Sequence, residues 1–227
     1  KQFHSGEGAI QFAPEAIARS NADILNNAHL KSEFIEIYTE QGKEEAKKWI
    51  NLNYGPFPEE ELNHRLTRYG LNPCGEILGN DFHCNLAEVH LNQINPDNVN
   101  EQRKAFKAAA LSVACLLNHE FEVERYRKSR EFDPIVGVSF TGLFDFFVHA
   151  FGTPWLKWWE KGRPDTEVGR QFKNKEAEFL DSWRTTVQQT VWEYCDKHNL
   201  RRPNRCTTVQ PAGTKSLLTG AAPGWHP

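Results

Sequence analysis

The sequence predicts an α/β fold, because short segments rich in β-branched residues alternate with segments that have helical patterning. Strands are expected at Cys84–Leu91, Pro134–Phe140 and Arg205–Gln210. The strongest helix between them spans residues 100–119, where apolar side chains recur at helical spacing. The composition, with 39% hydrophobic and 25% charged residues among 227, is that of an ordinary globular protein. Helices that cover a sheet are therefore the expected architecture.

The part before the first strand is predicted to be mostly helical. A helix is expected to begin at Pro14, since proline is tolerated in a first turn, and to run to about Asn27. A second helix is expected over residues 31–51, with a Lys/Glu-rich face in solvent. The other features expected here are a turn at Ser5–Gly8, a short apolar stretch at Ala9–Phe12, a break at Tyr54–Pro58 and a short polar helix at Glu59–Arg68.

The later helices carry most of the aromatic residues. Cys115 lies on or next to the apolar stripe of the helix at 100–119 and is expected to be a buried structural thiol. Residues 165–199 are expected to form one long helix or a broken pair, and Cys195 at its end is expected to be structural. Cys206 is read as a strand residue. The other expected elements are a turn and cap at Asn95–Asn98 and an apolar helix at Leu143–Ala150. The tryptophan-rich segment at Pro154–Trp159 is expected to pack against a neighbouring helix, with a stacking platform for a nucleotide base or another ring as the alternative.

Charge and cysteine content exclude several classes of protein. The formal net charge of −3 gives no sign of attraction to nucleic acid or to a membrane surface, and no apolar run approaches the length of a membrane span. Five cysteines do not form a secreted disulfide framework, so a cytoplasmic protein is expected. The chain opens at Lys1 and closes on Gly224–Pro227, and we expect it to be a fragment of a longer polypeptide.

The stretch Tyr69–Ile77 is the candidate reactive centre. It places an amide (Asn72), a thiol (Cys74) and a carboxylate (Glu76) at alternating positions, with Pro73 and Gly75 between them. Proline and glycine predict a shaped loop, and residues at i, i+2 and i+4 of an extended segment point to one side. The three polar groups are therefore expected to converge, with a second thiol, Cys84, ten residues after Cys74.

Four interpretations of this loop compete. A structural turn with incidental cysteines explains the proline and glycine but not the alternation of polar groups. A zinc site formed by Cys74, His83 and Cys84 lacks a fourth ligand and any C-x-x-C pair, so no metal is expected. A cysteine hydrolase has no residue nearby that marks an oxyanion hole. The fourth is redox or radical chemistry, in which one thiol reacts, a carboxylate moves a proton and a second thiol supplies reducing equivalents.

A second candidate site follows the last expected strand. The segment of Pro211, Ala212, Gly213, Thr214, Lys215 and Ser216 is a turn of small residues before an apolar Leu217–Leu218. A strand, a small-residue turn and a helix start form a typical phosphate site, because backbone N–H groups and the helix dipole point outward. The side chains of Thr214, Lys215 and Ser216 can add donors.

Three motifs, Asn72–Glu76, Cys84–Leu86 and Pro211–Ser216, resemble in this order the signatures of the ribonucleotide reductase catalytic subunit. The short interval from Cys74 to Cys84 and the stretch Gly152–Trp159 resemble the monomeric adenosylcobalamin-dependent (class II) ribonucleoside-triphosphate reductases. The resemblance implies that residues 1–227 are part of a ten-stranded α/β barrel with an internal finger loop, without the N-terminal and C-terminal parts of the full enzyme.

The resemblance also implies roles for individual residues. Cys74 would become a thiyl radical that removes the ribose 3′ hydrogen, and Glu76 would take the proton of the 3′ hydroxyl. Asn72 would hydrogen-bond the ribose and hold that carboxylate. Cys84 would be one of two cysteines that reduce the ribose, and its partner would lie upstream of Lys1. The turn at 211–216 would hold the substrate phosphates.

The activity implied is the reduction of ribonucleoside triphosphates to 2′-deoxyribonucleoside triphosphates, the precursors for DNA replication. Adenosylcobalamin would be the cofactor, a thioredoxin-type dithiol the reductant and a deoxynucleotide the allosteric effector of the full enzyme. The fragment alone is expected to be inactive. Two alternatives stay open: a diphosphate-reducing large subunit that receives its radical from an iron subunit, and a non-catalytic phosphate-binding module.

Overall fold

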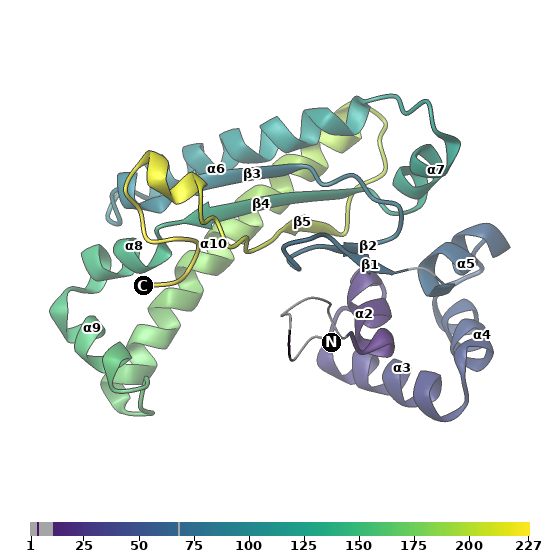
Figure 1. Cartoon of the computed structure of the whole chain (residues 1–227), viewed down its shortest axis with the longest axis horizontal. Coiled ribbons are helices and arrows are strands. Elements are labelled where there is room, and N and C mark those ends of the chain that lie inside the picture. Colours follow the sequence, from purple (N-terminus) through teal and green to yellow (C-terminus); the bar gives the residue numbers. More distant parts are fainter. Residues whose placement is uncertain (1–3, 5–10, 68) are drawn as a thin grey trace. The chain divides into compact units, whose positions relative to one another are not determined.

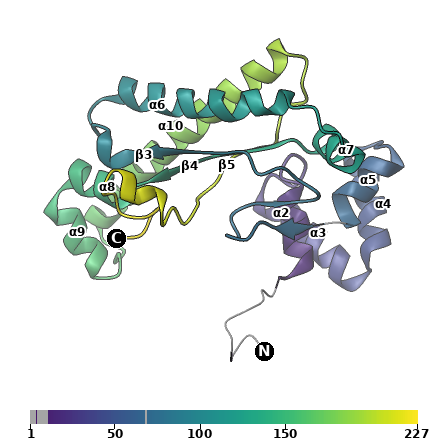
Figure 2. The ribbon, with the colours of Figure 1, turned by 45° about the horizontal axis from the view of Figure 1, so that its top comes forward.

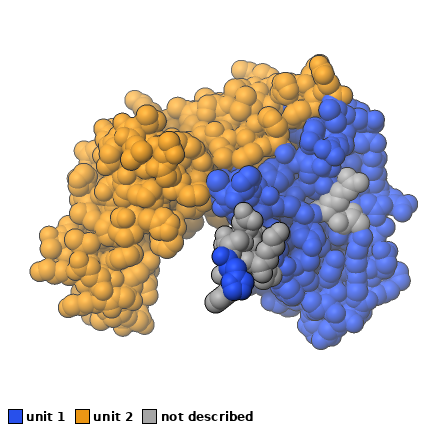
Figure 3. All heavy atoms as spheres, viewed as in Figure 1, with its two compact units in different colours: residues 1–82, 123–133 blue, residues 83–122, 134–227 orange. Residues whose placement is uncertain are grey.

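The computed structural model describes residue 4, residues 11–67 and residues 69–227 (Figure 1). The turn expected at Ser5–Gly8 and the first two residues of the apolar stretch at Ala9–Phe12 lie outside the described residues. The chain divides into two compact units, one of residues 1–82 and 123–133 and the other of residues 83–122 and 134–227 (Figure 3). Within the part of the chain that the structure describes, no helix is long and apolar enough to cross a membrane.

The first unit is built from helices and one small hairpin. The helices pack around a core of aliphatic side chains and Phe34, and the hairpin strands pair antiparallel. The described elements are α2 (Ala13–Ser20), α3 (Ala28–Glu40), α4 (Lys43–Tyr54), α5 (Glu59–Thr67), α7 (Glu124–Phe132), β1 (Gly70–Leu71) and β2 (Leu78–Gly79).

Two asparagines explain why the first helix is shorter than predicted. The buried side chain of Asn21 donates from Nδ2 to the Ile17 carbonyl at 2.9 Å, and such a bond competes with the helical pattern and ends α2. Asn27, predicted as the end of this helix, is instead the N-cap of α3, where its Oδ1 accepts from the Leu30 N–H at 3.0 Å. The single helix predicted over 31–51 is wrong for a similar local reason: Gly42, at φ 91°, separates α3 from α4.

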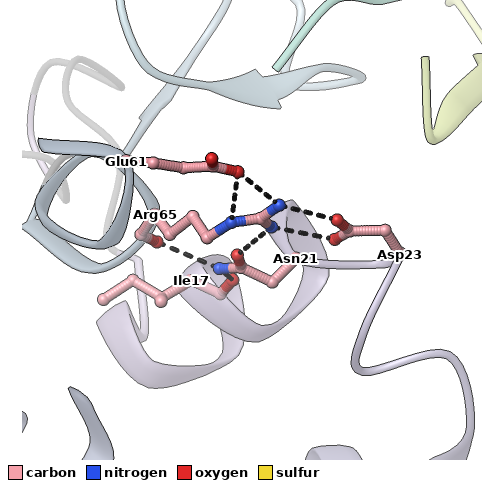
Figure 4. Close-up of polar contacts among 5 residues, drawn as sticks. All are labelled: Ile17, Asn21, Asp23, Glu61 and Arg65. Atoms are coloured by element: carbon pink, nitrogen blue, oxygen red, sulfur yellow. Dashed lines mark hydrogen bonds and ion pairs between the residues drawn. The ribbon is translucent and has the colours of Figure 1, made fainter. Parts of the chain in front are cut away.

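A buried arginine joins α5 to the segment after α2 (Figure 4). The Arg65 guanidinium donates to Asp23 Oδ2 at 2.8 Å, to Glu61 Oε1 at 2.9 Å and to Asn21 Oδ1 at 3.1 Å. Burial by itself lowers the pKa of Arg65, but the hydrogen bonds and charges of Asp23 and Glu61 outweigh it and leave the pKa above its ordinary value. Arg65 therefore remains charged in the interior of this unit.

The second unit contains a parallel sheet covered by helices. Its strands are β3 (Leu86–His90), β4 (Ile135–Thr141) and β5 (Arg205–Thr207), in that order, and both neighbouring pairs are parallel. Parallel neighbours need crossover connections, which the helices supply. These are α6 (Val99–Ala114), α8 (Leu143–Phe151), α9 (Thr153–Glu160) and α10 (Glu167–Lys197), with short 3-10 turns η1 (Leu91–Gln93), η2 (Cys115–Asn118) and η3 (Lys215–Leu218).

The two faces of this sheet differ in chemistry. The register pairs Ala87 with Val138 and Val89 with Phe140, and these side chains join the apolar core beneath α6 and α10. Figure 2 shows both helices on one side of the strands. Because side chains alternate along a strand, the intervening pairs, Glu88 with Ser139 and His90 with Thr141, lie on the other face. The polar face is the one that matters for the candidate site.

The tryptophan-rich segment Pro154–Trp159 packs into the core, as predicted. Trp155 and Trp158 are buried, and their indole N–H groups donate to Glu176 Oε1 at 2.7 Å and to the Pro164 carbonyl at 2.9 Å. Trp183 of α10 stacks on Phe106 of α6 with ring centroids 5.0 Å apart. The mixed α/β character is thus confirmed, while the closed barrel remains a prediction.

The cysteines of this unit divide into buried and exposed thiols. Cys195 and Cys206 are buried, which fits the structural role predicted for Cys195, and Cys206 lies in β5, as predicted. Burial, followed by the nearby Asp196, raises the pKa of Cys195 to about 11, and burial, followed by Cys195, raises the pKa of Cys206 to about 12. The expectation that Cys115 is buried was wrong, because it is exposed. At about 100° per residue Cys115 lies about half a turn from the face that buries Phe106 and Val113.

Replacement of Arg65 by methionine should destabilise the first unit by about 3–5 kcal/mol, the usual cost of removing one partner of a buried ion pair. Chemical denaturation followed by hydrogen exchange in α2 and α5 measures the loss. The matched control is Arg19→Met, which removes an exposed ion pair to Glu15 at 2.6 Å and should change stability by less than about 1 kcal/mol. Equal effects of the two substitutions would contradict the role given to Arg65.

Thiol labelling should separate the cysteines of the second unit. Cys115 is expected to react readily at pH 8, whereas Cys195 and Cys206 should resist until the chain is unfolded, because burial keeps them protonated. Because the pKa values of Cys195 and Cys206 are raised in the folded chain, their protonated thiols favour folding. This contribution to stability is fully present below the pKa of an unfolded thiol, about 8.5, and is lost as the pH rises through about 11 to 12. Peptide mapping after alkylation at pH 8 checks the order of reaction; fast labelling of Cys206 in the native chain would contradict it.

Candidate active site

The loop at Asn72–Ile77 is the tip of the β1–β2 hairpin, and Asn72 closes it. The Asn72 N–H donates to the Ile77 carbonyl at 3.2 Å, and the Ile77 N–H donates to Asn72 Oδ1 at 3.1 Å. The Gly75 N–H donates to the Asn72 carbonyl at 2.9 Å, which makes Asn72–Gly75 a β-turn with Pro73 at its second position. The shaped loop predicted from the proline and glycine is present, and three hydrogen bonds define it, one donated and two accepted by Asn72.

The side chains of Cys74 and Glu76 differ in their exposure to solvent on this turn. Gly75 adopts φ 77°, a left-handed conformation that favours glycine. The Cys74 side chain is exposed at the tip, and Glu76 is half-buried, with its Oε2 atom shielded from solvent. The hairpin therefore brings Asn72, Cys74 and Glu76 onto one six-residue loop, on which Cys74 is the exposed member of the three.

Cys84 lies in the second unit, two residues before β3. Its thiol is exposed. The preceding His83 packs edge-on against Phe121 with centroids 5.1 Å apart, and its Nδ1 lies 3.2 Å from Oδ1 of the buried Asn85. The pairing of Cys84 with the Cys74 loop, which the resemblance implies, remains a prediction.

The turn at 211–216 is held to the polar face of the sheet at both of its ends. Before the turn, the Gln210 N–H donates to Ser139 Oγ at 3.0 Å. After it, Thr219 Oγ1 lies 2.7 Å from His90 Nδ1, and the Ala222 carbonyl accepts from the Gly142 N–H at 2.8 Å. The segment 210–224 thus crosses the carboxyl ends of β3 and β4, where ligands of parallel sheets commonly bind.

Gly142 explains how the returning segment comes so close. It has φ 71°, and a Cβ there would lie 3.2 Å from Ala221 Cβ and 3.0 Å from the Asn92 N atom. A larger residue would push the segment after the turn away from the strand ends. The glycine after β4 is therefore part of the site's framework.

The turn itself differs from the prediction in two ways. The expected strand to Gln210 ends at Thr207, and the expected helix start is the single 3-10 turn η3 of four residues. A helix this short has almost no macrodipole, so the expectation of dipole support was wrong. Donors at this turn must come from its own N–H groups and side chains.

The Lys215 ammonium points to two polar groups of the sheet. Nζ donates to Gln210 Oε1 at 2.5 Å and lies 3.1 Å from Glu88 Oε2 on β3. The contact with Glu88 is an ion pair without good hydrogen-bond direction, since the same oxygen has no hydrogen-bond partner. Ser216 is buried, and its hydroxyl donates to the Gly213 carbonyl at 3.0 Å.

Sequence reasoning missed the residues that support this turn. Glu88, Ser139 and Gln210 sit side by side on β3, on β4 and after β5. The signal for Glu88 was a charged residue between Ala87 and Val89, inside a strand with otherwise apolar neighbours. No sequence pattern indicated Ser139 or Gln210, because their role depends on strand register.

The described residues also form an apolar cavity that is separate from this site, and they form no candidate metal centre. An apolar cavity of about 540 Å³ is lined by Val138, Phe140 and Trp183, on the face of the sheet that packs against α10, and none of the predicted site residues lines it. Among the described residues, no group of three or more His, Cys, Asp or Glu side chains is placed to hold a metal ion.

Comparison with known proteins gives one consistent result. No protein-family model matches the chain. An adenosylcobalamin-dependent ribonucleoside-triphosphate reductase of Lactobacillus gasseri is 30% identical over 167 residues, which cover 69% of this chain and 22% of the relative. Proteins of the same description from Lacticaseibacillus paracasei and Lactobacillus leichmannii are 30% and 25% identical, with the same coverage. A crystal structure described as a B12-dependent (class II) ribonucleotide reductase has 24% identity and a TM-score of 0.49 over 68% of this chain and 22% of that one.

The chain spans about a fifth of the length of the curated relatives that it matches. The similarity nevertheless extends over 69% of this chain, far beyond the three short motifs. The resemblance that the motifs predicted is confirmed: this chain is similar in sequence to the adenosylcobalamin-dependent ribonucleoside-triphosphate reductases.

Proposed function

We propose that this chain is part of the catalytic domain of an adenosylcobalamin-dependent ribonucleoside-triphosphate reductase, which converts ribonucleoside triphosphates to 2′-deoxyribonucleoside triphosphates. The observation that carries the proposal is the exposed Cys74 thiol on a hydrogen-bonded hairpin tip, two residues before the Glu76 carboxylate. The names of the similar proteins support the reaction and the cofactor. We also propose that the parallel sheet belongs to a ten-stranded barrel, in which the hairpin is the internal finger loop.

In this proposal the residues of the loop have separate tasks. A Cys74 thiyl takes a hydrogen atom from C3′ of the ribose, and Glu76 accepts the proton of the 3′ hydroxyl. A firm loop suits hydrogen abstraction, because small misplacements of a reacting atom are costly. Asn72 contributes by closing the loop through Oδ1, and any hydrogen bond that its side chain donates to the ribose comes from Nδ2.

The reduction balances with two thiols. Cys84 and a second cysteine, which we place in a part of the enzyme outside this chain, supply two electrons and two protons and become a disulfide. The 2′ hydroxyl leaves as water, and the hydrogen atom returns from Cys74 to C3′. A thioredoxin-type dithiol then reduces the disulfide by thiol–disulfide exchange.

Adenosylcobalamin, when bound, supplies the one-electron chemistry that makes a thiyl radical from a thiol. Cys74 suits this chemistry because its thiol is exposed at the loop tip rather than packed in a core. The turn at Pro211–Ser216 is proposed to hold the triphosphate. A deoxynucleotide effector and a cytoplasmic location complete the proposal for the whole enzyme.

Substitution of Cys74 by serine in the full-length protein should abolish reduction of a ribonucleoside triphosphate while substrate binding is retained, because the hydroxyl cannot form the radical at comparable cost. The assay measures deoxynucleotide formation with adenosylcobalamin and a dithiol, and equilibrium dialysis measures binding. Cys115→Ser, which changes an exposed thiol that is not part of the loop, is the control and should keep full activity.

Three outcomes would contradict the proposal. Unchanged activity of Cys74→Ser would indicate that the loop does no chemistry. Activity that needs an iron-containing subunit instead of adenosylcobalamin would replace the cofactor assignment. Binding without any reduction by the unmodified full-length protein would favour a non-catalytic phosphate-binding module.

A pair of substitutions should separate the two tasks of Asn72. Asn72→Asp keeps an oxygen acceptor for the Ile77 N–H but removes the amide donor, so stability should be retained while kcat falls by about 10- to 100-fold. Asn72→Ala removes both, so the melting temperature and kcat should both fall. Thermal unfolding and steady-state kinetics check this, with Asn53→Asp on exposed α4 surface as the control. Wild-type turnover of Asn72→Asp would show that Asn72 only closes the loop.

A further inference from the structure

Glu88 is a buried charge with one charged neighbour among the described residues. Only 3% of its side chain is exposed, and the Lys215 ammonium lies 3.1 Å from its Oε2. Its other oxygen, Oε1, receives no hydrogen bond from any described residue. A buried carboxylate is unfavourable unless a positive charge lies close to it. The Lys215 ammonium offsets the free-energy cost of burying the Glu88 carboxylate.

Lys215 is held to the sheet by the same contacts. Its ammonium donates to Gln210 Oε1 at 2.5 Å, and Gln210 is itself 5% exposed and joined through its N–H to Ser139 Oγ. One hydrogen of the ammonium is used in the hydrogen bond to Gln210, and the contact with Glu88 is an ion pair. The formal charges of Lys215 and Glu88 cancel, so the pair adds little net charge to the turn.

The outer side of the turn offers other donors. Gly213 and Thr214 are exposed, and within the described part of the chain no acceptor uses their backbone N–H groups. The Ser216 hydroxyl, by contrast, is engaged with the Gly213 carbonyl. Besides the Lys215 ammonium, whose side chain is 47% exposed, the donors at the turn for a phosphate are the backbone N–H groups of Gly213 and Thr214 and the Thr214 hydroxyl.

We propose that Glu88 is a positioning residue that holds Lys215 against the sheet as a neutral pair, so that the substrate's phosphates are bound by the donors of Gly213 and Thr214 and not by the lysine ammonium. The inference rests on the proposed function of the turn as the triphosphate site. In this proposal Glu88 sets the net charge of the phosphate site. That net charge, and not direct contact with Lys215, controls the affinity of the site for the substrate's phosphates.

Four forms of the full-length protein test the proposal: the unmodified protein, Glu88→Gln, Lys215→Met and the double variant. Calorimetric titration with ATP measures Kd at low and high salt. Glu88→Gln leaves one uncompensated positive charge and should bind ATP about 5- to 10-fold more tightly, while Lys215→Met leaves one negative charge and should bind it more weakly by a similar factor. The double variant has no net charge change and should bind within about threefold of the unmodified protein.

The dependence of Kd on salt concentration distinguishes an effect of charge from a purely structural effect. The opposite effects of the two single variants should shrink at high ionic strength, because screening weakens charge effects near a surface. The matched control is the exposed ion pair of Lys175 and Glu178 on α10, whose nitrogen and oxygen lie 3.0 Å apart. Lys175→Met and Glu178→Gln should leave Kd unchanged.

The double variant decides the question. If it binds ATP as weakly as Lys215→Met, the lysine is a direct phosphate ligand and the proposal is overturned. Weaker binding by Glu88→Gln would overturn it as well. Because Glu88→Gln and the double variant leave no unpaired buried charge, both keep the test valid if Lys215→Met folds poorly. If the unmodified protein binds no ATP, the proposed function of the turn fails, and this inference fails with it; binding with the wrong order of variants refutes the inference alone.

Discussion

The parallel register of β3 and β4 is the constraint on which the second unit depends. It sets Val89 beside Phe140 on the face beneath the helices and Glu88 beside Ser139 on the other face. A shift of β3 by one residue would turn its side chains to the opposite faces, which would place the Glu88 carboxylate against the aromatic core and Val89 on the polar face. The register therefore decides at once where the helices pack and where polar groups gather for the segment at 210–224.

The sequence predicted the features that depend on local chemistry. The strands near Cys84, Ile135 and Arg205 and the shaped loop around Pro73 and Gly75 follow from β-branched content, proline and glycine, and all are present. Helix boundaries at Asn21 and Gly42 were missed, because a side-chain amide and a left-handed glycine ended helices whose apolar pattern continued. The helix α7 was not predicted, since its sequence is strongly charged and lacks an apolar stripe.

The candidate site was only partly predictable for a physical reason. Asn72, Cys74 and Glu76 are close in sequence, so their spacing was enough to place them on one loop. Glu88, Gln210 and Lys215 meet through strand pairing and chain return, and no short motif contains all three. The direction of the Lys215 side chain is a further property of tertiary structure. Motifs thus identified the candidate site residues, whereas the polar groups around Lys215 appeared only in the fold.

The excursion of residues 123–133 has a consequence for how the chain is assembled during synthesis. This segment belongs to the first compact unit, where Lys128 pairs with Glu60 and Ser129 donates to the Asn80 carbonyl. Yet it is made after β3 and α6 of the second unit. The first unit cannot be completed on the ribosome until those elements have emerged. The two units therefore cannot fold one after the other in the order of translation. Residues 83–122 must be closed into a loop before residues 123–133 can join the first unit. Folding of the unit that contains the Cys74 hairpin is therefore coupled to folding of the sheet.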